Sequence, residues 1–228
     1  MGDPNNVVEM KSIVVVLTGN PASGKSTLAE HLSEELGGLA VLKFDDYFDS
    51  LQGWPNDMRT WVNEGAEIDE WKNFRLTRDI VSLINGTSIL NPTTKKNINP
   101  SPIILVEDPS GRERSEMVEL IDYLIFIEIP NEISLIRSLT RWLNSEKVKK
   151  DGKRVKKRDE DPEELLKNMM EFVGLYLESY RDMYVIVCDK VKKKADLIID
   201  GLKEPKVLVQ EVLQFLKEQN IESLEGEK

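Results

Sequence analysis

The chain has 228 residues, of which 40% are hydrophobic and 32% charged, the proportions of an ordinary globular protein. No apolar run approaches the roughly 18 residues of a membrane-spanning helix, and the polar segment 1–11 lacks the apolar stretch of a signal peptide. Cys188 is the only cysteine and His31 the only histidine, which excludes an internal disulfide, a Cys/His zinc site and a Ser-His-Asp triad. The net charge of −10 opposes a general nucleic-acid-binding surface. These features predict a cytoplasmic protein with neither a nucleic-acid nor a membrane partner.

A phosphate-binding loop motif, G-x-x-x-x-G-K-[ST], lies near the N-terminus. A β-branched run precedes it and a segment with apolar residues at helical spacing follows it, which is the strand–loop–helix context that the motif requires. In such a loop, backbone N–H groups hold phosphate oxygens, Lys25 reaches the β- and γ-phosphates and the Ser26 hydroxyl can ligate Mg²⁺. The nucleotide-binding residues that the motif predicts are Gly19, Asn20, Pro21, Ala22, Ser23, Gly24, Lys25, Ser26 and Thr27.

Strands and helices are expected to alternate along the chain. The expected strands are 12–17, 39–44, 102–106, 121–129 and 195–200, and the expected helices follow the motif and cover 71–84, 134–143, 163–184 and 204–220. Irregular segments are expected at 49–66, with short helical pieces, and at 87–101, as a hairpin or long loop. This alternation predicts an α/β fold, a doubly wound parallel sheet with flanking helices, in one domain over 1–228.

A strongly basic stretch interrupts the acidic chain. It contains eight lysines and arginines within twelve residues: Lys147, Lys149, Lys150, Lys153, Arg154, Lys156, Lys157 and Arg158. One interpretation is a solvated loop, and the other is a lid over about residues 137–160 that closes over phosphates.

Acidic pairs follow two of the expected strands. Asp45 and Asp46 come after the second strand, and Glu107 and Asp108 come after the third. Ligands gather at the carboxyl ends of parallel strands. There one carboxylate can orient an acceptor hydroxyl and take its proton, and another can hold Mg²⁺. Each pair alone could instead cap a helix or a turn. The chain has no N-K-x-D motif of a switch GTPase, which favours phosphoryl transfer to a small molecule over hydrolysis.

Over about residues 12–200 the chain resembles the uridine kinase/phosphoribulokinase family. The matching features, in chain order, are the phosphate-binding loop, Phe44-Asp45-Asp46-Tyr47-Phe48, Ile104-Leu105-Val106-Glu107, Leu124-Ile125-Phe126-Ile127-Glu128 with Arg137 and Arg141, and Lys193-Lys194-Ala195-Asp196-Leu197-Ile198-Ile199. The resemblance implies a P-loop kinase fold with a helical lid and a kinase that uses ATP and Mg²⁺.

The resemblance also implies roles for individual residues. Asp45 would be the general base, and Glu107 with Ser26 would hold Mg²⁺. Arg137 and Arg141 would neutralise charge on the transferring phosphoryl group beside Lys25, since a guanidinium fork suits that contact. The acceptor contacts that it implies are Asp45, Tyr47 and Asp69.

The chain departs from the family pattern at three positions. Asp108 stands where the family usually has Gly, Ser138 replaces the second arginine of the lid pair, and Trp142 replaces the aspartate after the last arginine. These substitutions motivate a second hypothesis, a regulatory protein that binds ATP without catalysis. The acceptor-binding segment departs as well, since Gly65-Ala66-Glu67-Ile68-Asp69-Glu70-Trp71 stands where uridine kinases usually carry a P-x-A-F-D type sequence. The resemblance therefore supports a kinase more strongly than it supports uridine as the acceptor.

The acceptor stays open at this point. A nucleoside comes first, and nicotinamide riboside, pantothenate, a sugar acid or a nucleoside monophosphate are alternatives. A monophosphate would need a further arginine, for which Arg59, Arg75 and Arg78 are available. Trp54, Trp61 and Trp71 could stack on a flat ring, although such residues more often fill the core. The sequence leaves a homo-oligomer open.

Overall fold

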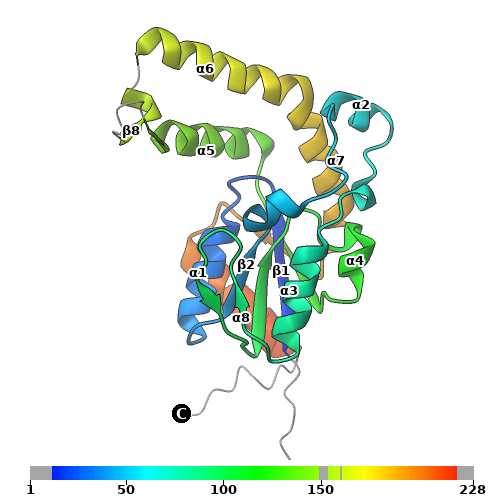
Figure 1. Cartoon of the computed structure of the whole chain (residues 1–228). Coiled ribbons are helices and arrows are strands. Elements are labelled where there is room, and N and C mark those ends of the chain that lie inside the picture. Colours follow the sequence, from blue (N-terminus) through cyan, green and yellow to red (C-terminus); the bar gives the residue numbers. More distant parts are fainter. Residues whose placement is uncertain (1–11, 149–153, 160, 220–228) are drawn as a thin grey trace, which may run out of the picture.

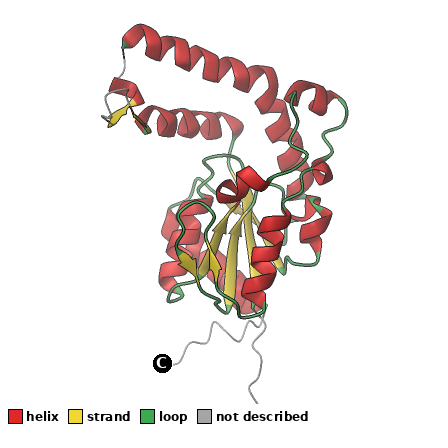
Figure 2. Ribbon diagram, in the orientation of Figure 1, coloured by secondary structure: helices red, strands yellow, loops and turns green. Residues whose placement is uncertain are grey.

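The computed structural model describes residues 12–148, 154–159 and 161–219. A five-stranded parallel sheet in the order β2-β5-β1-β6-β9 forms the centre of the molecule (Figure 2). Its strands are β1 (Ile13–Gly19), β2 (Ala40–Lys43), β5 (Ile103–Glu107), β6 (Tyr123–Glu128) and β9 (Leu197–Asp200). This is the doubly wound parallel sheet that the sequence predicts, with β1 and its phosphate-binding loop in the middle.

Helices cover both faces of the sheet and extend beyond its carboxyl edge (Figure 1). They are α1 (Lys25–Glu35), α2 (Met58–Asn63), α3 (Phe74–Ile84), α4 (Ser115–Val118), α5 (Asn131–Asn144), α6 (Pro162–Leu175), α7 (Arg181–Lys192) and α8 (Pro205–Glu218). Short 3₁₀ helices are η1 (Phe44–Ser50), η2 (Ile68–Glu70), η3 (Gly111–Glu113) and η4 (Lys157–Asp159), and a π-helical turn is η5 (Tyr176–Tyr180). Within the described ranges, no helix combines the length and apolarity needed to cross a membrane.

Two hydrophobic layers hold the helices against the sheet. On β1, the side chains of Val14 and Val16 pack toward α3 and α7, while those of Val15 and Leu17 pack toward α1 and α8. All four are fully buried, because a parallel sheet between two helical layers has no solvent-facing side. The sheet is therefore a rigid base for the loops at its carboxyl edge.

The region expected to form a lid, about residues 137–160, begins within α5 and ends just before α6, and these two helices lie side by side beyond the carboxyl ends of the strands (Figure 1). The Trp142 and Phe172 rings lie 6.0 Å apart between them. In the basic stretch, β7 (Glu146–Val148) pairs antiparallel with β8 (Arg154–Lys156). One interpretation of the sequence expected only a loop here. Residues 149–153 lie outside the described part of the chain. Lys157 Nζ sits 4.5 Å from the centre of the Trp142 ring, a cation–π contact.

The helix expected at 163–184 is longer than its pattern suggests. Instead of ending near residue 184, it continues through η5 into α7 and ends at Lys192. The helix contains one irregularity, a π-helical turn at 176–180. Such turns insert one residue into a helix and are frequent at functional sites.

The helix expected from Trp71 also starts elsewhere. It begins as α3 at Phe74, because the Asn73 side chain caps it by accepting a hydrogen bond from the Leu76 N–H.

The two remaining irregular segments are as expected. Residues 87–101 contain a small hairpin, β3 (Ile89–Leu90) paired with β4 (Asn97–Ile98). Residues 49–66 are mostly loop with the short helix α2.

Candidate active site

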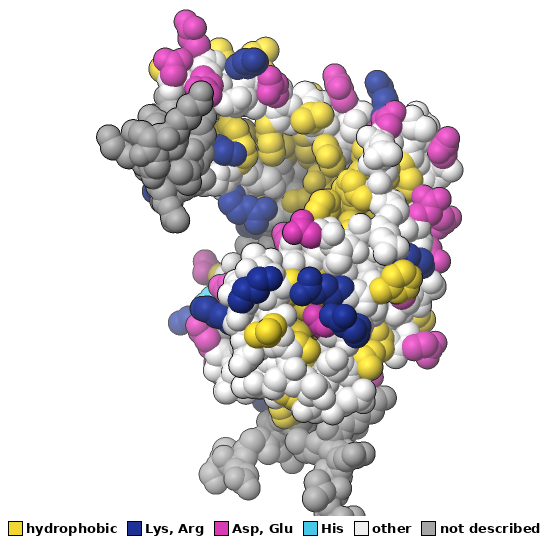
Figure 3. Space-filling view, in the orientation of Figure 1, with side chains coloured by type: hydrophobic (Ala, Val, Ile, Leu, Met, Phe, Trp, Pro, Cys, Tyr) yellow, Lys and Arg dark blue, Asp and Glu magenta, His cyan; other side chains and the backbone are white. Residues whose placement is uncertain are grey.

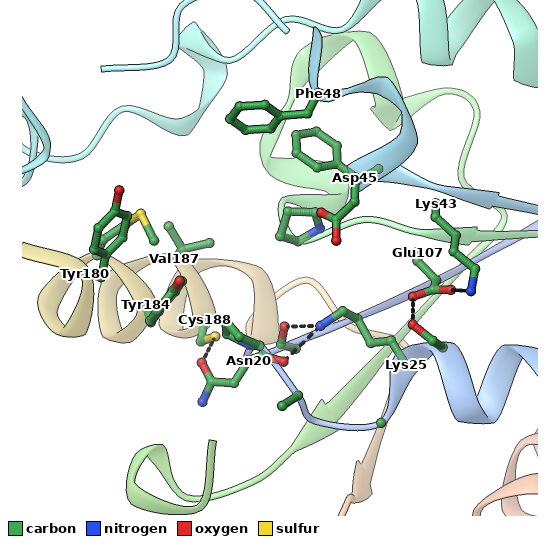
Figure 4. A pocket seen from close by; sticks show the side chains of 18 of the residues that line it. Asn20, Lys25, Lys43, Asp45, Phe48, Glu107, Tyr180, Tyr184, Val187 and Cys188 are labelled. Carbon is green, nitrogen blue, oxygen red and sulfur yellow. Dashed lines mark hydrogen bonds and ion pairs between the residues drawn. The ribbon is translucent and has the colours of Figure 1, made fainter. Parts of the chain in front are cut away.

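The phosphate-binding loop connects β1 to α1 with two glycines in conformations that other residues rarely adopt. Gly19 has a φ of +134° and Gly24 a φ of +107°. A Cβ on Gly19 would lie 2.4 Å from the Ile127 carbonyl oxygen, so glycine is required where β1 and β6 are adjacent. Lys25 Nζ donates hydrogen bonds to the carbonyl oxygens of Gly19 and Asn20, both at 2.9 Å (Figure 4). The backbone carbonyls of the loop thus hold the Lys25 ammonium group on the concave side of the loop.

Opposite charges surround this lysine. Burial lowers the pKa of Lys25, and the carboxylates of Glu107 and Asp45 oppose that shift. Glu107 is only 7% exposed at the end of β5, and the Ser26 hydroxyl donates to its Oε2 at 2.7 Å. Lys43, its neighbour on β2, forms an ion pair with Oε1 at 3.4 Å. One ammonium group and one hydroxyl therefore contact this buried carboxylate, and its charge also acts on Lys25.

Asp45 lies across the cavity from the phosphate-binding loop. It belongs to η1, directly after β2, and its exposed carboxylate points into the cavity in Figure 4. Asp46 accepts a hydrogen bond from Asn91 at 2.9 Å and does not line the cavity. Of the acidic pair, one carboxylate faces the loop and the other anchors a neighbouring segment.

Aromatic side chains form one wall of this cavity, which has a volume of about 450 Å³. Phe48, Trp54 and Trp71 line it. The Trp54 ring centre lies 4.8 Å from that of Trp71 and 5.4 Å from that of Phe48. Trp61 stacks behind Trp71 at 4.9 Å but does not reach the cavity. The sequence left open whether the tryptophans face a ligand or fill the core. In the structure, Trp54 and Trp71 line the cavity and Trp61 belongs to the core.

The opposite wall comes from η5 and α7, which sequence reasoning missed. Its lining residues are Tyr180, Met183, Tyr184, Val187 and Cys188. They recur every three or four residues on one helical stripe, a signal that looks the same as a stripe facing a core. Burial raises the pKa of Tyr184 to about 12 and that of Cys188 to about 12. The Cys188 Sγ lies 2.9 Å from Asn20 Oδ1, which joins this wall to the phosphate-binding loop (Figure 4).

The two lid arginines occupy different surroundings. Arg141 lines the cavity and also borders a second cavity of about 490 Å³ between α5 and the α6–η5 segment. Arg137 does not line either cavity; its Nη1 lies 3.4 Å from the Gly201 carbonyl oxygen. Arg141 therefore lies where the sequence expects a phosphate contact, whereas the expected contact of Arg137, one helical turn earlier on α5, stays a prediction.

Two expected acceptor contacts lie outside the cavity. Tyr47 is 1% exposed in the core near Asp79, because the turn of η1 that points Asp45 outward points Tyr47 inward. Asp69 accepts hydrogen bonds from Lys72 and from the Ser115 N–H, which tie η2 to α4. Neither side chain lines the cavity, so both expectations are corrected.

The second acidic pair also separates. Asp108 is fully buried and pairs with Arg114, pointing away from Glu107 and the cavity. The departure from the family's usual glycine therefore adds no carboxylate to the site.

A family model described as an AAA domain, AAA_18, matches residues 15–166, two thirds of the 228-residue chain. The chain belongs to this family. The match includes the phosphate-binding loop, Asp45, Glu107 and both lid arginines, so the family region contains the side of the cavity formed by that loop. The wall formed by η5 and α7 lies beyond it.

Curated relatives confirm the resemblance to uridine kinases. A uridine kinase of Clostridium perfringens (strain ATCC 13124) is 25% identical over 222 residues, covering 91% of this chain and 96% of that protein. A uridine kinase of Mycoplasma genitalium is 27% identical over 207 residues, covering 84% and 86%. Among solved structures, a possible uridine kinase from Bacillus stearothermophilus aligns with a TM-score of 0.44 and 17% identity, covering 83% of this chain and 89% of that one.

Proposed function

We propose that the chain is an ATP-dependent kinase that transfers the γ-phosphoryl group to a hydroxyl of a small, uncharged, ring-bearing acceptor, with a nucleoside as the first candidate. One observation carries the proposal: the Asp45 carboxylate faces the phosphate-binding loop across a cavity whose other walls are lined mainly by aromatic and aliphatic side chains (Figure 4). A carboxylate in that position can orient a hydroxyl and accept its proton. The uridine kinases among the relatives support the same reading.

The residues at the phosphate-binding loop would have different roles in the reaction. Backbone N–H groups of residues 19–27 would hold the β- and γ-phosphates at the N-terminus of α1. The Lys25 ammonium is partly buried and held at the loop by two carbonyl oxygens, where its positive charge would stabilise the charge on the phosphates. Arg141 would approach from the lid side of the same cavity.

The donor set suits Mg²⁺ that arrives with ATP. The described part of the chain holds no cluster of three or more acidic, Cys or His side chains that would bind a metal alone. Ser26 Oγ and the buried Glu107 carboxylate are adjacent, and Glu107 Oε1 accepts no hydrogen bond from the described residues. Mg²⁺ in kinases takes few protein oxygens and completes its shell with phosphates and water. When bound, the ion would neutralise charge between the β- and γ-phosphates.

The charges around the cavity favour an uncharged acceptor. The cationic side chains that line it are Lys25, Lys43 and Arg141, and the first two already meet the loop carbonyls and Glu107. None of Arg59, Arg75 and Arg78, which a nucleoside monophosphate could have used, lines it. The aromatic walls instead offer flat apolar faces to a ring.

The test is ADP release from ATP and Mg²⁺ across a panel of acceptors: nucleosides, nicotinamide riboside, pantothenate, glycerate, sugars and nucleoside monophosphates. Turnover is expected with a nucleoside or another uncharged ring-bearing acceptor. Asp45→Asn is expected to lower kcat by about 10²- to 10⁴-fold, because the amide cannot take the proton. Asp46→Asn is the matched control, since that neighbouring carboxylate contacts Asn91 outside the cavity.

Equal losses in both variants would argue against Asp45 as the base. ATP binding without turnover of any acceptor would favour the regulatory alternative. Turnover of a monophosphate or a sugar acid alone would reject the uncharged acceptor and keep the kinase.

The same proposal includes a setting for the protein. The chain would act as one domain over 1–228 with a lid over about 137–160, in the cytoplasm, with ATP and a small molecule as its partners and no nucleic acid or membrane. The C-terminal helix α8, expected at 204–220, packs on the sheet through Leu208, Val212 and Leu216.

A further inference from the structure

A buried arginine lies behind the cavity. Arg114 is 0% exposed between η3 and α4. Its Nη2 pairs with Asp108, and its Nη1 donates to Glu116 Oε1 at 3.1 Å. One guanidinium thus joins the buried Asp108 and the partly buried Glu116, and its planar fork fixes their relative geometry more tightly than a flexible ammonium would. Each carboxylate leads to a different part of the cavity wall.

The first connection fixes the end of β5. Asp108 directly follows Glu107, and its Oδ1 accepts the N–H groups of Ser110 and Gly111 at 2.8 and 2.9 Å. Its own N–H donates to the Leu17 carbonyl on β1. Pairing with Arg114 completes this set of bonds, so the strand end that carries Glu107 is held on several sides.

The second connection reaches the acceptor side. Glu116 Oε1 also accepts the N–H of Asn73 at 2.6 Å, two residues after Trp71. The fully buried Asn73 side chain donates to the Tyr47 carbonyl at 2.9 Å, two residues after Asp45. The chain of bonds therefore runs from the guanidinium to the backbone of both segments that supply the acceptor wall.

A third contact is direct. The Arg114 Cζ lies 5.4 Å from the centre of the Phe44 ring, and Phe44 lines the cavity beside Asp45. We infer that Arg114 is a positioning residue, which sets Asp45 and Trp71 relative to Glu107 through Asp108, Glu116 and the Phe44 ring. The expected effect on acceptor kinetics rests on the proposed function, whereas the expected effect on the packing of the tryptophans does not.

Arg114→Lys is the informative variant. It keeps the positive charge but offers neither a fork for two carboxylates nor a flat face for Phe44. The matched control is Arg112→Lys in the same turn. That guanidinium also pairs with a carboxylate, Asp196 at 2.8 Å, and donates to the Asp122 carbonyl, but both partners lie at the amino ends of β9 and β6, away from the cavity.

Three measurements are compared in the two full-length variants: near-ultraviolet circular dichroism of the stacked tryptophans, ATP binding, and kcat and KM for the acceptor identified above. Arg114→Lys is expected to alter the tryptophan signal and to lower kcat/KM for the acceptor by about 10- to 100-fold, the size expected for a misplacement on the order of 1 Å. ATP binding is expected to stay within about twofold, because residues 19–27 form the loop without Arg114. Arg112→Lys is expected to match the wild type in all three.

If Arg114→Lys does not fold, Glu116→Gln replaces it. That substitution keeps the shape and removes the charge that faces the guanidinium, and the same changes in smaller size are expected. Folded variants with an unchanged tryptophan signal and with acceptor kinetics like those of Arg112→Lys would overturn the inference. Wild-type protein without turnover would reject the proposed function instead, while the tryptophan signal would still decide the positioning role.

Discussion

The two ends of the cavity are built in different ways. The phosphate end comes from eight residues of the loop 19–27, all but Ser23, together with Glu107 on an adjacent strand. The acceptor end comes from Phe48, Trp54, Trp71 and the η5–α7 segment, more than a hundred residues further along the chain. Under the proposed function, phosphate would be bound by local backbone geometry that one short motif specifies. The acceptor, in contrast, would be bound by a surface that only tertiary packing assembles.

The sharpest test of the phosphate end is Lys25→Met. We expect kcat to fall by about 10³-fold, because the substitution removes a preorganised charge at the phosphates. Since burial lowers the pKa of Lys25, the charged ammonium is disfavoured by the fold, and the variant is expected to unfold at no lower temperature than the wild type. ADP release and thermal unfolding measure the two effects.

Lys190→Met is the control for this variant. Lys190 Nζ likewise donates to two backbone carbonyls, those of Gly65 at 3.1 Å and Ala66 at 2.8 Å, outside the cavity. Comparable losses of kcat in both variants would contradict a special role for Lys25.

The acceptor end is tested by Trp54→Leu. We expect KM for the acceptor to rise about fivefold to tenfold and KM for ATP to stay unchanged, because ring stacking is worth about 0.5–1.5 kcal/mol. Trp61→Leu is the matched control, since Trp61 belongs to the same stack but does not line the cavity. It should cost stability and leave KM for the acceptor near that of the wild type. If Trp54→Leu raised KM for ATP equally, the division between the two ends would fail.

The contrast explains what the sequence could predict. The sheet, its order of strands and helices and the loop at 19–27 follow from apolar runs and a local motif, which need no knowledge of distant contacts. Asp45 and Glu107 were found because parallel strands end at the same edge.

The rest depends on side-chain direction and on distant packing. The conformation of η1 decides whether Tyr47 or Asp45 faces the cavity. Asp69 instead accepts a hydrogen bond from the Ser115 N–H at the start of α4. The stripe on α7 has the spacing of any buried face. No pattern in the sequence pairs Arg114 with Asp108, because only the folded turn after β5 brings them together.

A smaller effect is expected at Asp69, outside the cavity. Hydrogen bonds from Lys72 and Ser115 lower its pKa from 3.8 to about 2. A folded-state pKa below the unfolded one means that the contribution to stability is present above about pH 4 and is lost as the pH falls through about 2. Asp69→Asn should therefore cost about 0.5–1 kcal/mol at pH 7, given screening at this partly exposed site, and progressively less below pH 4.

Denaturation of wild type and variant at several pH values measures this difference. KM for the acceptor should change by less than about twofold, as expected of a tether between η2 and α4. A large rise in KM without loss of stability would instead return Asp69 to the acceptor site.

A further effect is expected at Cys188, where the two ends of the cavity meet. Burial raises the pKa of its thiol to about 12, so little thiolate forms at neutral pH and iodoacetamide should alkylate the native protein far more slowly than the unfolded one. In Cys188→Ser the hydroxyl can still donate to Asn20 Oδ1, and KM for ATP should stay within about twofold of the wild type. Cys188→Ala removes the donor and should raise that KM by several fold, because a buried acceptor on the phosphate-binding loop loses its partner. Equal KM values for the serine and alanine variants would mean that packing alone joins the α7 wall to the loop.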